Sequence, residues 1–480
     1  MAAKKLVLTY VDSLRTDMLE RAVAAGRAPA FGQLLERGTL VPDCVSSFPS
    51  VTPVACAELV TGVAADRHWI SGMNWYHRLE RRYVEYGTSL EASRAFGVFR
   101  TLYDLVYNMN LAHLNPEAET LFERLDDAGL RTACTPFLIY RGRHRHQVSL
   151  EGLLRRAVET TRLKFRHHTW GPGELFYGDL YASREVPCKS TSIPGARDEY
   201  SACCAAQLER AGDYDFLLFS LPDNDNFSHR HGPEESVESI AKADRCFGEL
   251  VEAGGGLDAF LDEHAVILVA DHAHTAVSRG LPLADLLSQD WTVLAPSEHG
   301  AEGAQLAVSP TSRAAHVYLL PGEGPRAEHA DVAGRLAEIE GIDLICWRED
   351  DAAVVERRGE RLRFRPGGKT RDARGGRWQL DGDPETLPPY EYPDAYARVY
   401  AALASPAAGD FIVSLAPGYE TVDWGGISHA GGGSHGALHR GDSLGPLLFV
   451  GCGPEDPGVR EQWALRDVAG VVCEHFGLAF

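Results

Sequence analysis

Short, predominantly apolar runs that each end close to an acidic residue are the clearest pattern along this chain. Such runs are typical of parallel strands that are buried on both faces of a sheet. Apolar residues then recur at helical spacing between 237 and 251, where a crossover helix is needed to join parallel strands. The pattern predicts an α/β fold with a doubly wound, mostly parallel sheet flanked by helices. The runs, each with its acidic residue, are 5–11 with Asp12, 214–221 with Asp223, and 265–270 with Asp271.

Two regions interrupt this alternation of strands and helices. Residues 66–112 are rich in Trp, Tyr and Phe, and we expect them to form an excursion on the substrate side of the core. Residues 291–404 combine short strand-like runs, Gly and Pro breaks and a charged hairpin-like stretch, which predicts a smaller α+β insertion that forms a cap. The remaining segments, 1–290 and 405–480, are predicted to form the catalytic core.

The chain is strongly acidic. Its 480 residues include 47 Lys and Arg against 68 Asp and Glu, for a formal net charge of −21. Such a surface repels nucleic-acid polymers and anionic bilayers, so we expect neither as a partner. A small anionic substrate stays compatible with this charge if bound cations reverse the sign locally.

The first residues and the cysteines bear on location. The apolar run at 5–11 is too short, and too soon followed by Asp12, for a signal peptide or a membrane span. The ten cysteines lack the paired spacing of metal sites, and only Cys203 and Cys204 are adjacent. We therefore expect reduced thiols and a cytoplasmic location. Nothing in the sequence indicates an oligomeric state.

Acidic residues and histidines gather at the predicted carboxyl ends of the strands. Ligands bind at this edge of an open α/β sheet, so these side chains should converge there. Carboxylate oxygens and imidazole nitrogens suit zinc and similar ions, and there are enough of them for two metals. Asp223 competes with Asp225, but only Asp225 lies four residues before His229. The predicted ligands are Asp12, Asp225, His229, Asp271, His272 and His435.

Thr52 is the candidate nucleophile. Pro53 suits the first position of a predicted helix, which makes Thr52 its N-cap. A hydroxyl at a helix N-terminus lies where phosphate binding is already favoured. An alcohol is a poor nucleophile at neutral pH, but metal coordination activates it.

Five short motifs resemble, in order, those of the type I phosphodiesterase/nucleotide pyrophosphatase family of the alkaline phosphatase superfamily. Four contain the predicted ligands, and the fifth places Thr52 nine residues before a Thr-Gly pair. Ser13, Ser228 and Ala273 replace family glycines without removing a ligand. The motifs are Val-Asp-Ser-Leu-Arg-Thr-Asp at 11–17, Thr52 with Thr61-Gly62, Asp-Asn-Phe-Ser-His-Arg-His-Gly-Pro at 225–233, Ala-Asp-His-Ala-His at 270–274 and Ser-His-Gly at 434–436.

The resemblance implies an alkaline-phosphatase-like fold and two divalent ions, with zinc as the first choice and manganese or iron as alternatives. It implies that Thr52 is the nucleophile and that Asn74 contacts a phosphate oxygen. By the family pattern, one ion lies on Asp225, His229 and His435, and the other on Asp12, Thr52, Asp271 and His272.

Two further groups are candidates for substrate contacts. Trp75 and Tyr76 follow the nucleophile helix and form either a substrate platform or local core. Arg141 and Arg143 open a basic stretch at 141–168, which is either a solvated face or a subsite for a second anionic group of the substrate.

These observations predict an enzyme that hydrolyses a small phosphate ester with two metals, through a phospho-Thr52 intermediate. The expected substrate is either a phosphodiester or pyrophosphate, or a small phosphate monoester. The alternatives are a phosphotransferase or mutase, a phosphonate hydrolase, and a metal-binding relative without catalysis. The substrate partner would be a small phosphorylated molecule in every catalytic version.

Overall fold

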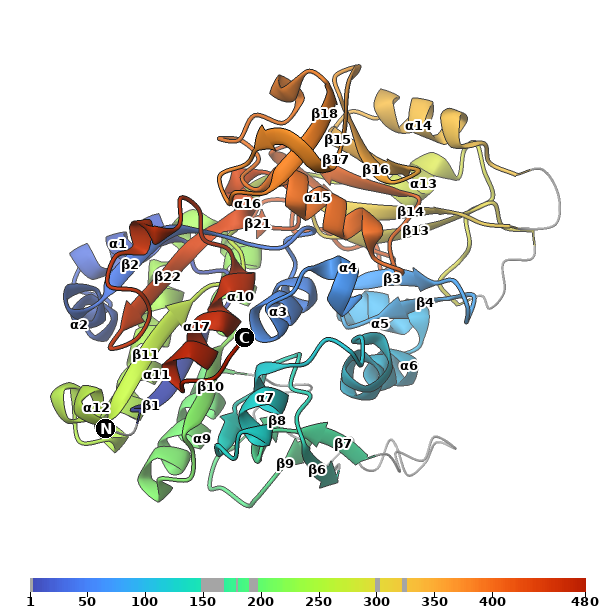
Figure 1. Ribbon diagram of the computed structural model, residues 1–480. Coiled ribbons are helices and arrows are strands. Elements are labelled where there is room, and N and C mark those ends of the chain that lie inside the picture. Colours follow the sequence, from blue (N-terminus) through green and yellow to red (C-terminus); the bar gives the residue numbers. More distant parts are fainter. Residues whose placement is uncertain (1–2, 148–167, 178–179, 190–196, 298–302, 322–325) are drawn as a thin grey trace.

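The computed structural model describes residues 3–147, 168–177, 180–189, 197–297, 303–321 and 326–480. Two sheets organise this part of the chain, a large mixed sheet and a smaller antiparallel one (Figure 1). The described residues contain no helix with the length and apolar composition needed to cross a bilayer.

The large sheet has eight strands in the order β2-β22-β11-β1-β10-β5-β8-β9. Strands β11, β1, β10, β5 and β8 run parallel, whereas β22 pairs antiparallel with both β11 and β2, and β9 pairs antiparallel with β8. This confirms the predicted α/β fold class with a mostly parallel sheet. The strands are β1 (Lys5–Val11), β2 (Thr39–Val45), β5 (Thr132–Cys134), β8 (Glu174–Tyr177), β9 (Tyr181–Ala182), β10 (Phe216–Leu221), β11 (His264–Val269) and β22 (Leu444–Val450).

Helices cover both faces of this sheet, as doubly wound folds require (Figure 1). Alternate residues of β1 explain why the run at 5–11 is mostly apolar without alternation: Leu6 and Leu8 pack into one core and Val7 into the other. One core includes residues of α3 (Thr52–Thr61), α7 (Leu121–Asp127) and α17 (Val468–His475). The other includes residues of α1 (Thr16–Ala24), α2 (Pro29–Arg37), α9 (Asp198–Ala211), α11 (Val237–Ala253) and α12 (Leu257–Glu263).

The second sheet is antiparallel, with seven strands in the order β13-β14-β19-β15-β16-β17-β18. Six of its strands lie in the region predicted as the cap, and β19, which follows residue 404, pairs with β14 and β15 inside the sheet. Helices α13 (Leu283–Leu287), α14 (His329–Glu338) and α15 (Ala395–Ala404) accompany it. The strands are β13 (Leu306–Thr311), β14 (Ala314–Leu319), β15 (Ile342–Glu349), β16 (Ala352–Arg357), β17 (Glu360–Arg371), β18 (Arg377–Gly382) and β19 (Phe411–Leu415).

The aromatic region predicted as an excursion forms a hairpin followed by helices. Strands β3 (Asn74–His77) and β4 (Arg82–Glu85) pair antiparallel, and Tyr76 and Tyr83 join a core cluster with residues of β13 and β14. The other elements of this part are α4 (Ala65–His68), α5 (Leu90–Phe96), α6 (Val98–Tyr103) and a π-helix (Asp104–His113). Short elements elsewhere are β6 (His144–Gln147), β7 (His168–Gly171), α10 (Asp223–His231), β12 (Thr275–Leu281), β20 (Gly418–Thr421), β21 (Gly433–Ser434) and α16 (Arg440–Ser443).

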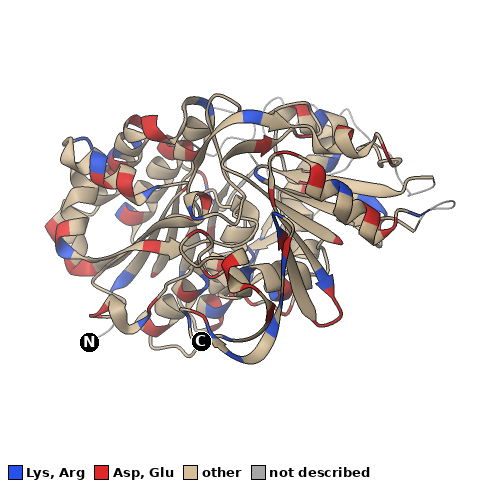
Figure 2. Cartoon of the chain, turned by 90° about the horizontal axis from the view of Figure 1, so that it is seen from above, with Lys and Arg blue, Asp and Glu red and all other residues tan. Residues whose placement is uncertain are grey.

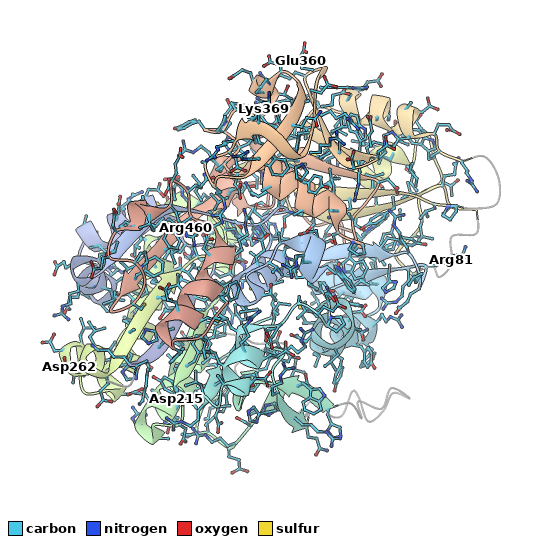
Figure 3. The ribbon with its side chains drawn as sticks, in the orientation of Figure 1. Arg81, Asp215, Asp262, Glu360, Lys369 and Arg460 are labelled. Atoms are coloured by element: carbon cyan, nitrogen blue, oxygen red, sulfur yellow. A yellow bond between two sulfur atoms is a disulfide. The ribbon has the colours of Figure 1, made fainter. Side chains whose placement is uncertain are left out.

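Acidic and basic residues are spread over the helices and loops of the molecule (Figure 2). Exposed examples are Asp262 on α12 and Glu360 and Lys369 on β17 (Figure 3). The net negative charge is therefore distributed over the surface instead of marking one binding face.

One disulfide corrects the expectation that all thiols are reduced. Cys188 and Cys203 are bonded, with 15 residues of sequence separation. Cys203 lies in α9, so the bond ties the segment before this helix to the helix itself. The other eight cysteines are unpaired and, except for Cys452, buried.

Candidate metal centre

The carboxyl ends of three adjacent parallel strands bring the predicted ligands together. β1 lies between β10 and β11, and its last residues stand level with Leu221 and Val269. Asp12 follows β1 directly, α10 follows β10, and Asp271 lies two residues after β11. The register therefore places these carboxylates at one edge of the sheet.

The first group of candidate ligands surrounds Asp225. The Nε2 atoms of His229 and His435 lie 3.4 and 3.6 Å from its Oδ1 atom. On the far side of each ring, Nδ1 of His229 donates to the Gly433 carbonyl (2.8 Å) and Nδ1 of His435 donates to the Ser50 carbonyl (2.9 Å). Since these bonds place the proton on Nδ1, both Nε2 lone pairs face the group, as in histidine ligands of metals.

His274 is a member of this group that sequence reasoning did not select. Its Nε2 lies 2.8 Å from Oδ1 of Asp225, and it is buried like His435, whereas Asp225 and His229 are half-buried. Burial lowers the pKa of His274 to about 3, so the ring is neutral, and its Nδ1 has no partner among the described residues. The single ring proton is therefore best placed on Nε2, where it is donated to Asp225. The signal was the repeated His in Asp-His-Ala-His, two residues after a predicted ligand.

The second group consists of Asp12, Asp271 and His272, all buried. Nε2 of His272 lies 3.2 Å from Oδ2 of Asp271. Asp271 is held by the Tyr10 hydroxyl (2.8 Å) and by the backbone N–H of Ser13 (3.1 Å). These bonds fix the carboxylate before any ion binds.

Thr52 lies against the second group. Its Oγ1 is 3.3 Å from Nε2 of His272. Helix α3 begins at Thr52 and its N-cap is Val51, so the predicted N-cap role of Thr52 is wrong by one position and Pro53 is the second helical residue. The extended backbone of Val51 supplies the cap, which leaves the Thr52 hydroxyl to point at His272.

Ser13 joins the two groups. Its hydroxyl lies 2.8 Å from Oδ1 of Asp225 and 3.1 Å from Nδ1 of His272, and 3.3 Å from Oδ1 of Asp12. The backbone φ of Ser13 is 59°, a left-handed conformation that is uncommon for a residue other than glycine. The local backbone is therefore held in a strained form that aims a hydroxyl between the two groups.

The pKa values in the two groups indicate that a bound cation would stabilise their carboxylates. Burial and the nearby Asp271 and Asp225 raise the pKa of Asp12 well above its usual value, and burial raises the pKa of Asp271 to about 7. Burial alone would also raise the pKa of Asp225, but the neighbouring histidines bring it well below the ordinary range. Burial lowers the pKa of His272 to about 3. Neutral imidazoles beside repelling carboxylates are the donors that a divalent cation binds, so these residues fit two metal ions.

Asp223 does not compete for the site, in agreement with the preference for Asp225. Its carboxylate forms ion pairs with Lys242 (2.6 Å) and Arg197 (3.4 Å). His429 also stays outside the first group, although it stacks on His229 at 3.9 Å between ring centroids. Its Nδ1 pairs with Glu420 (2.8 Å), so the ring supports His229 from the side.

Asn74 lies in the β3–β4 hairpin, where its amide nitrogen is bonded, while its buried Oδ1 atom has no partner among the described residues. Its amide nitrogen donates to the Val84 carbonyl (2.9 Å) and to Glu85 (3.2 Å). Trp75 donates to the Tyr86 hydroxyl, and Tyr76 packs on Tyr83, so both rings are part of the core. No contact links these three residues to either ligand group among the described interactions, so their roles at the substrate stay predictions.

The two arginines of the basic stretch serve the fold. Arg141 is buried, pairs with Glu123 (3.0 Å) and donates to the carbonyls of Leu114 and Asn115. Arg143 pairs with acidic residues of the same region, including Glu123 (2.9 Å) and Asp127 (2.7 Å). These contacts favour an ion-paired face over an anion subsite for both arginines. Residues 148–167 of the stretch lie outside the described residues.

Fold and site together define an alkaline-phosphatase-like fold with two groups of candidate metal ligands at the carboxyl edge of its main sheet. The chain belongs to the type I phosphodiesterase/nucleotide pyrophosphatase family, whose model matches residues 6–437. Similar solved structures include phosphonoacetate hydrolase from Sinorhizobium meliloti 1021, in complexes with phosphonoformate and with phosphonoacetate. In both comparisons the identity is 17%, the TM-score is 0.58, and the match covers 99% of this chain and 96% of the other. A sequence search among curated proteins finds no match.

Proposed function

We propose that this protein hydrolyses a phosphate ester with Thr52 as the nucleophile and two divalent ions as cofactors. The observation that carries the proposal is the position of the Thr52 hydroxyl, 3.3 Å from His272 and at the start of α3. Membership of the family supports metal-dependent phosphoryl hydrolysis. The phospho-Thr52 intermediate, the choice of zinc and the substrate are the further parts of the proposal.

The candidate ligands would divide between two ions according to their positions. Asp225, His229 and His435 would hold one ion, and Asp12, Asp271 and His272 the other. Bound divalent ions supply the positive charge that lowers the pKa of an alcohol and neutralises a transferring phosphoryl group. Mixed nitrogen and carboxylate donors favour zinc.

The protein itself orients the nucleophile. Helix α3 is buried along most of its length, so the Thr52 side chain is fixed at the edge of the site. The positive end of the helix dipole faces the same region and favours the phosphoryl oxygens. Attack of Thr52 Oγ1 on phosphorus would form the Oγ1–P bond and break the bond from phosphorus to the leaving oxygen, so that the Thr52 hydroxyl loses its proton and the leaving group departs as a protonated alcohol. Attack by water on phosphorus would then break the Thr52 Oγ1–P bond, return a proton to Oγ1 and release phosphate, or a phosphate monoester when the substrate is a diester.

The test is to compare Thr52→Ala with Thr52→Ser in metal-reconstituted protein. With 4-nitrophenyl phosphate or its diester as substrate, Thr52→Ala should lose nearly all turnover, and Thr52→Ser, which keeps the hydroxyl, should retain a measurable part of it. Rapid quench with 32P-labelled substrate should trap label on the wild-type chain and none on Thr52→Ala. Unchanged turnover in Thr52→Ala would exclude this nucleophile, and absence of turnover in the metal-reconstituted wild type would favour a non-catalytic metal-binding relative.

A further inference from the structure

A small cavity lies beside the candidate nucleophile. It has a volume of about 160 Å³ and is lined by Asp12 and Thr52 together with residues at the ends of β1, β8 and β10 and after β5. This is the edge of the sheet at which the parallel strands end. A group attached to a phosphorus atom at Thr52 has direct access to this space.

The walls of the cavity are mainly apolar. Its lining includes Met73, Phe137, Leu138 and Tyr177. The Phe137 ring packs edge-on against Tyr10 at 5.1 Å, and the Tyr10 hydroxyl is bonded to Asp271. The apolar walls are thus anchored to the same residues that fix the second ligand group.

The charges of the lining residues also limit which groups the cavity can bind. Asp12 is the only Asp or Glu among the described residues that line the cavity, and it is a predicted metal ligand. Among the described residues the lining holds no Lys, Arg or His. A carboxylate or second phosphate carried into this cavity would therefore lose its hydration without gaining a cationic partner, which is costly.

Volume sets the size of the group. A cavity of about 150 Å³ with apolar walls holds one benzene molecule. The cavity beside Thr52 is of the same size, so it accommodates one aromatic ring or a short branched alkyl chain.

From this we infer that the substrate of the proposed hydrolase carries a small, uncharged, apolar organic group, aryl or branched alkyl, which binds in the cavity lined by Phe137 and Leu138. The inference rests on the proposed function, because it assigns the organic part of the same substrate. It distinguishes this chain from enzymes that act on substrates whose organic group carries a carboxylate.

Matched ligands test the inference by binding and by turnover. Isobutylphosphonate and phosphonoacetate have similar size but differ in the charge of the organic group. In calorimetric titrations of metal-loaded protein, isobutylphosphonate should bind at least about tenfold tighter, the ratio equivalent to about 1.4 kcal/mol. In hydrolysis, isobutyl phosphate, which has an aliphatic leaving alcohol as phosphoglycolate does, should have a kcat/KM at least about tenfold above that of phosphoglycolate, for the same physical reason.

The variant Leu138→Arg reports on the cavity itself. It should invert the preference toward phosphonoacetate, whereas Leu286→Arg should leave it unchanged, since Leu286 is a similarly half-buried leucine packed against the second sheet. If Leu138→Arg does not fold, Leu138→Ala supplies the second test and should weaken isobutylphosphonate binding alone.

Each outcome bears on one claim. Equal or tighter binding of phosphonoacetate by the wild type overturns the inference even if phosphate esters are hydrolysed. Selective binding of isobutylphosphonate without hydrolysis of any ester supports the inference about the cavity and contradicts the proposed function.

Discussion

The hydroxyl of Ser13 lies 2.8 Å from the Asp225 carboxylate, although 212 positions separate the two residues in the chain. Ser13 immediately follows a residue of the second ligand group, and Asp225 is the centre of the first. Through this contact, a residue in the turn after β1 links the two groups of candidate ligands. Its positive φ shows that the backbone is held in an uncommon conformation to achieve this.

We predict that Ser13→Gly weakens metal binding without unfolding the protein. Glycine accepts the backbone conformation, but the hydroxyl that contacts both groups is lost, which should lower affinity by about two- to thirteenfold for one hydrogen bond of about 0.5–1.5 kcal/mol. Ser312→Gly is the matched control, because Ser312 has the same φ of 59° in the loop between β13 and β14. Chelator competition measures both, and equal losses would contradict a role for the Ser13 hydroxyl.

Removal of His274 should weaken metal binding by the first group of candidate ligands in particular. His274→Ala takes away the ring that contacts Asp225, and loss of such a supporting partner typically costs about 10- to 100-fold in metal affinity. His231→Ala, an exposed histidine at the end of α10, should have no such effect. Metal content after dialysis against graded chelator gives the measurement. Retention of both ions with wild-type affinity in His274→Ala would show that the contact is dispensable.

Glu58 should make stability depend on pH. Burial raises the pKa of Glu58 to about 7, against 4.5 for an ordinary Glu, despite the opposing influence of Arg466 and Arg398. Because the folded pKa is the higher one, the folded state binds more protons than the unfolded state between pH 4.5 and 7. The Glu58 contribution to the free energy of unfolding therefore falls as pH rises through this window, by about 3 kcal/mol in total.

The comparison of Glu58→Gln with Glu36→Gln checks this prediction. The first substitution removes the titration and should flatten the fall in stability between pH 5 and 8, while the second changes an exposed glutamate of α2 and should not. Urea unfolding at several pH values gives the free energies. A wild-type pH profile that persists in Glu58→Gln would assign the dependence to other groups.

The Cys188–Cys203 bond should contribute to stability. A disulfide across a 15-residue separation restricts the unfolded chain and is worth about 3 kcal/mol in the chain-entropy account. The double variant Cys188→Ser/Cys203→Ser should lower the free energy of unfolding accordingly, and Cys452→Ser, a half-buried free thiol, should change it little. Thiol counting by mass spectrometry under denaturing conditions must find eight free thiols in the wild type. Ten would show that the bond does not form.

The sequence by itself determined the class of fold and predicted which carboxylates and histidines lie together at the carboxyl edge of the sheet. Apolar runs such as 5–11 are long because both faces of β1 are buried, and the acidic residues that follow them report where parallel strands end. The four-residue spacing of Asp225 and His229 places both on one face of α10, so local helix geometry was sufficient to choose Asp225 over Asp223.

Tertiary structure decided what each neighbouring side chain does. The sequence left open whether Arg141 lies on a solvated face or in an anion subsite, and the structure pairs it with Glu123, 18 residues earlier in the chain. His274 and Ser13 read as ordinary loop residues, and both contact Asp225 only because β1, β10 and β11 lie side by side. Local propensity depends on the nearest few residues, whereas burial, ion pairing and cavity shape depend on segments hundreds of residues apart, so those properties emerge only when the sheet is assembled.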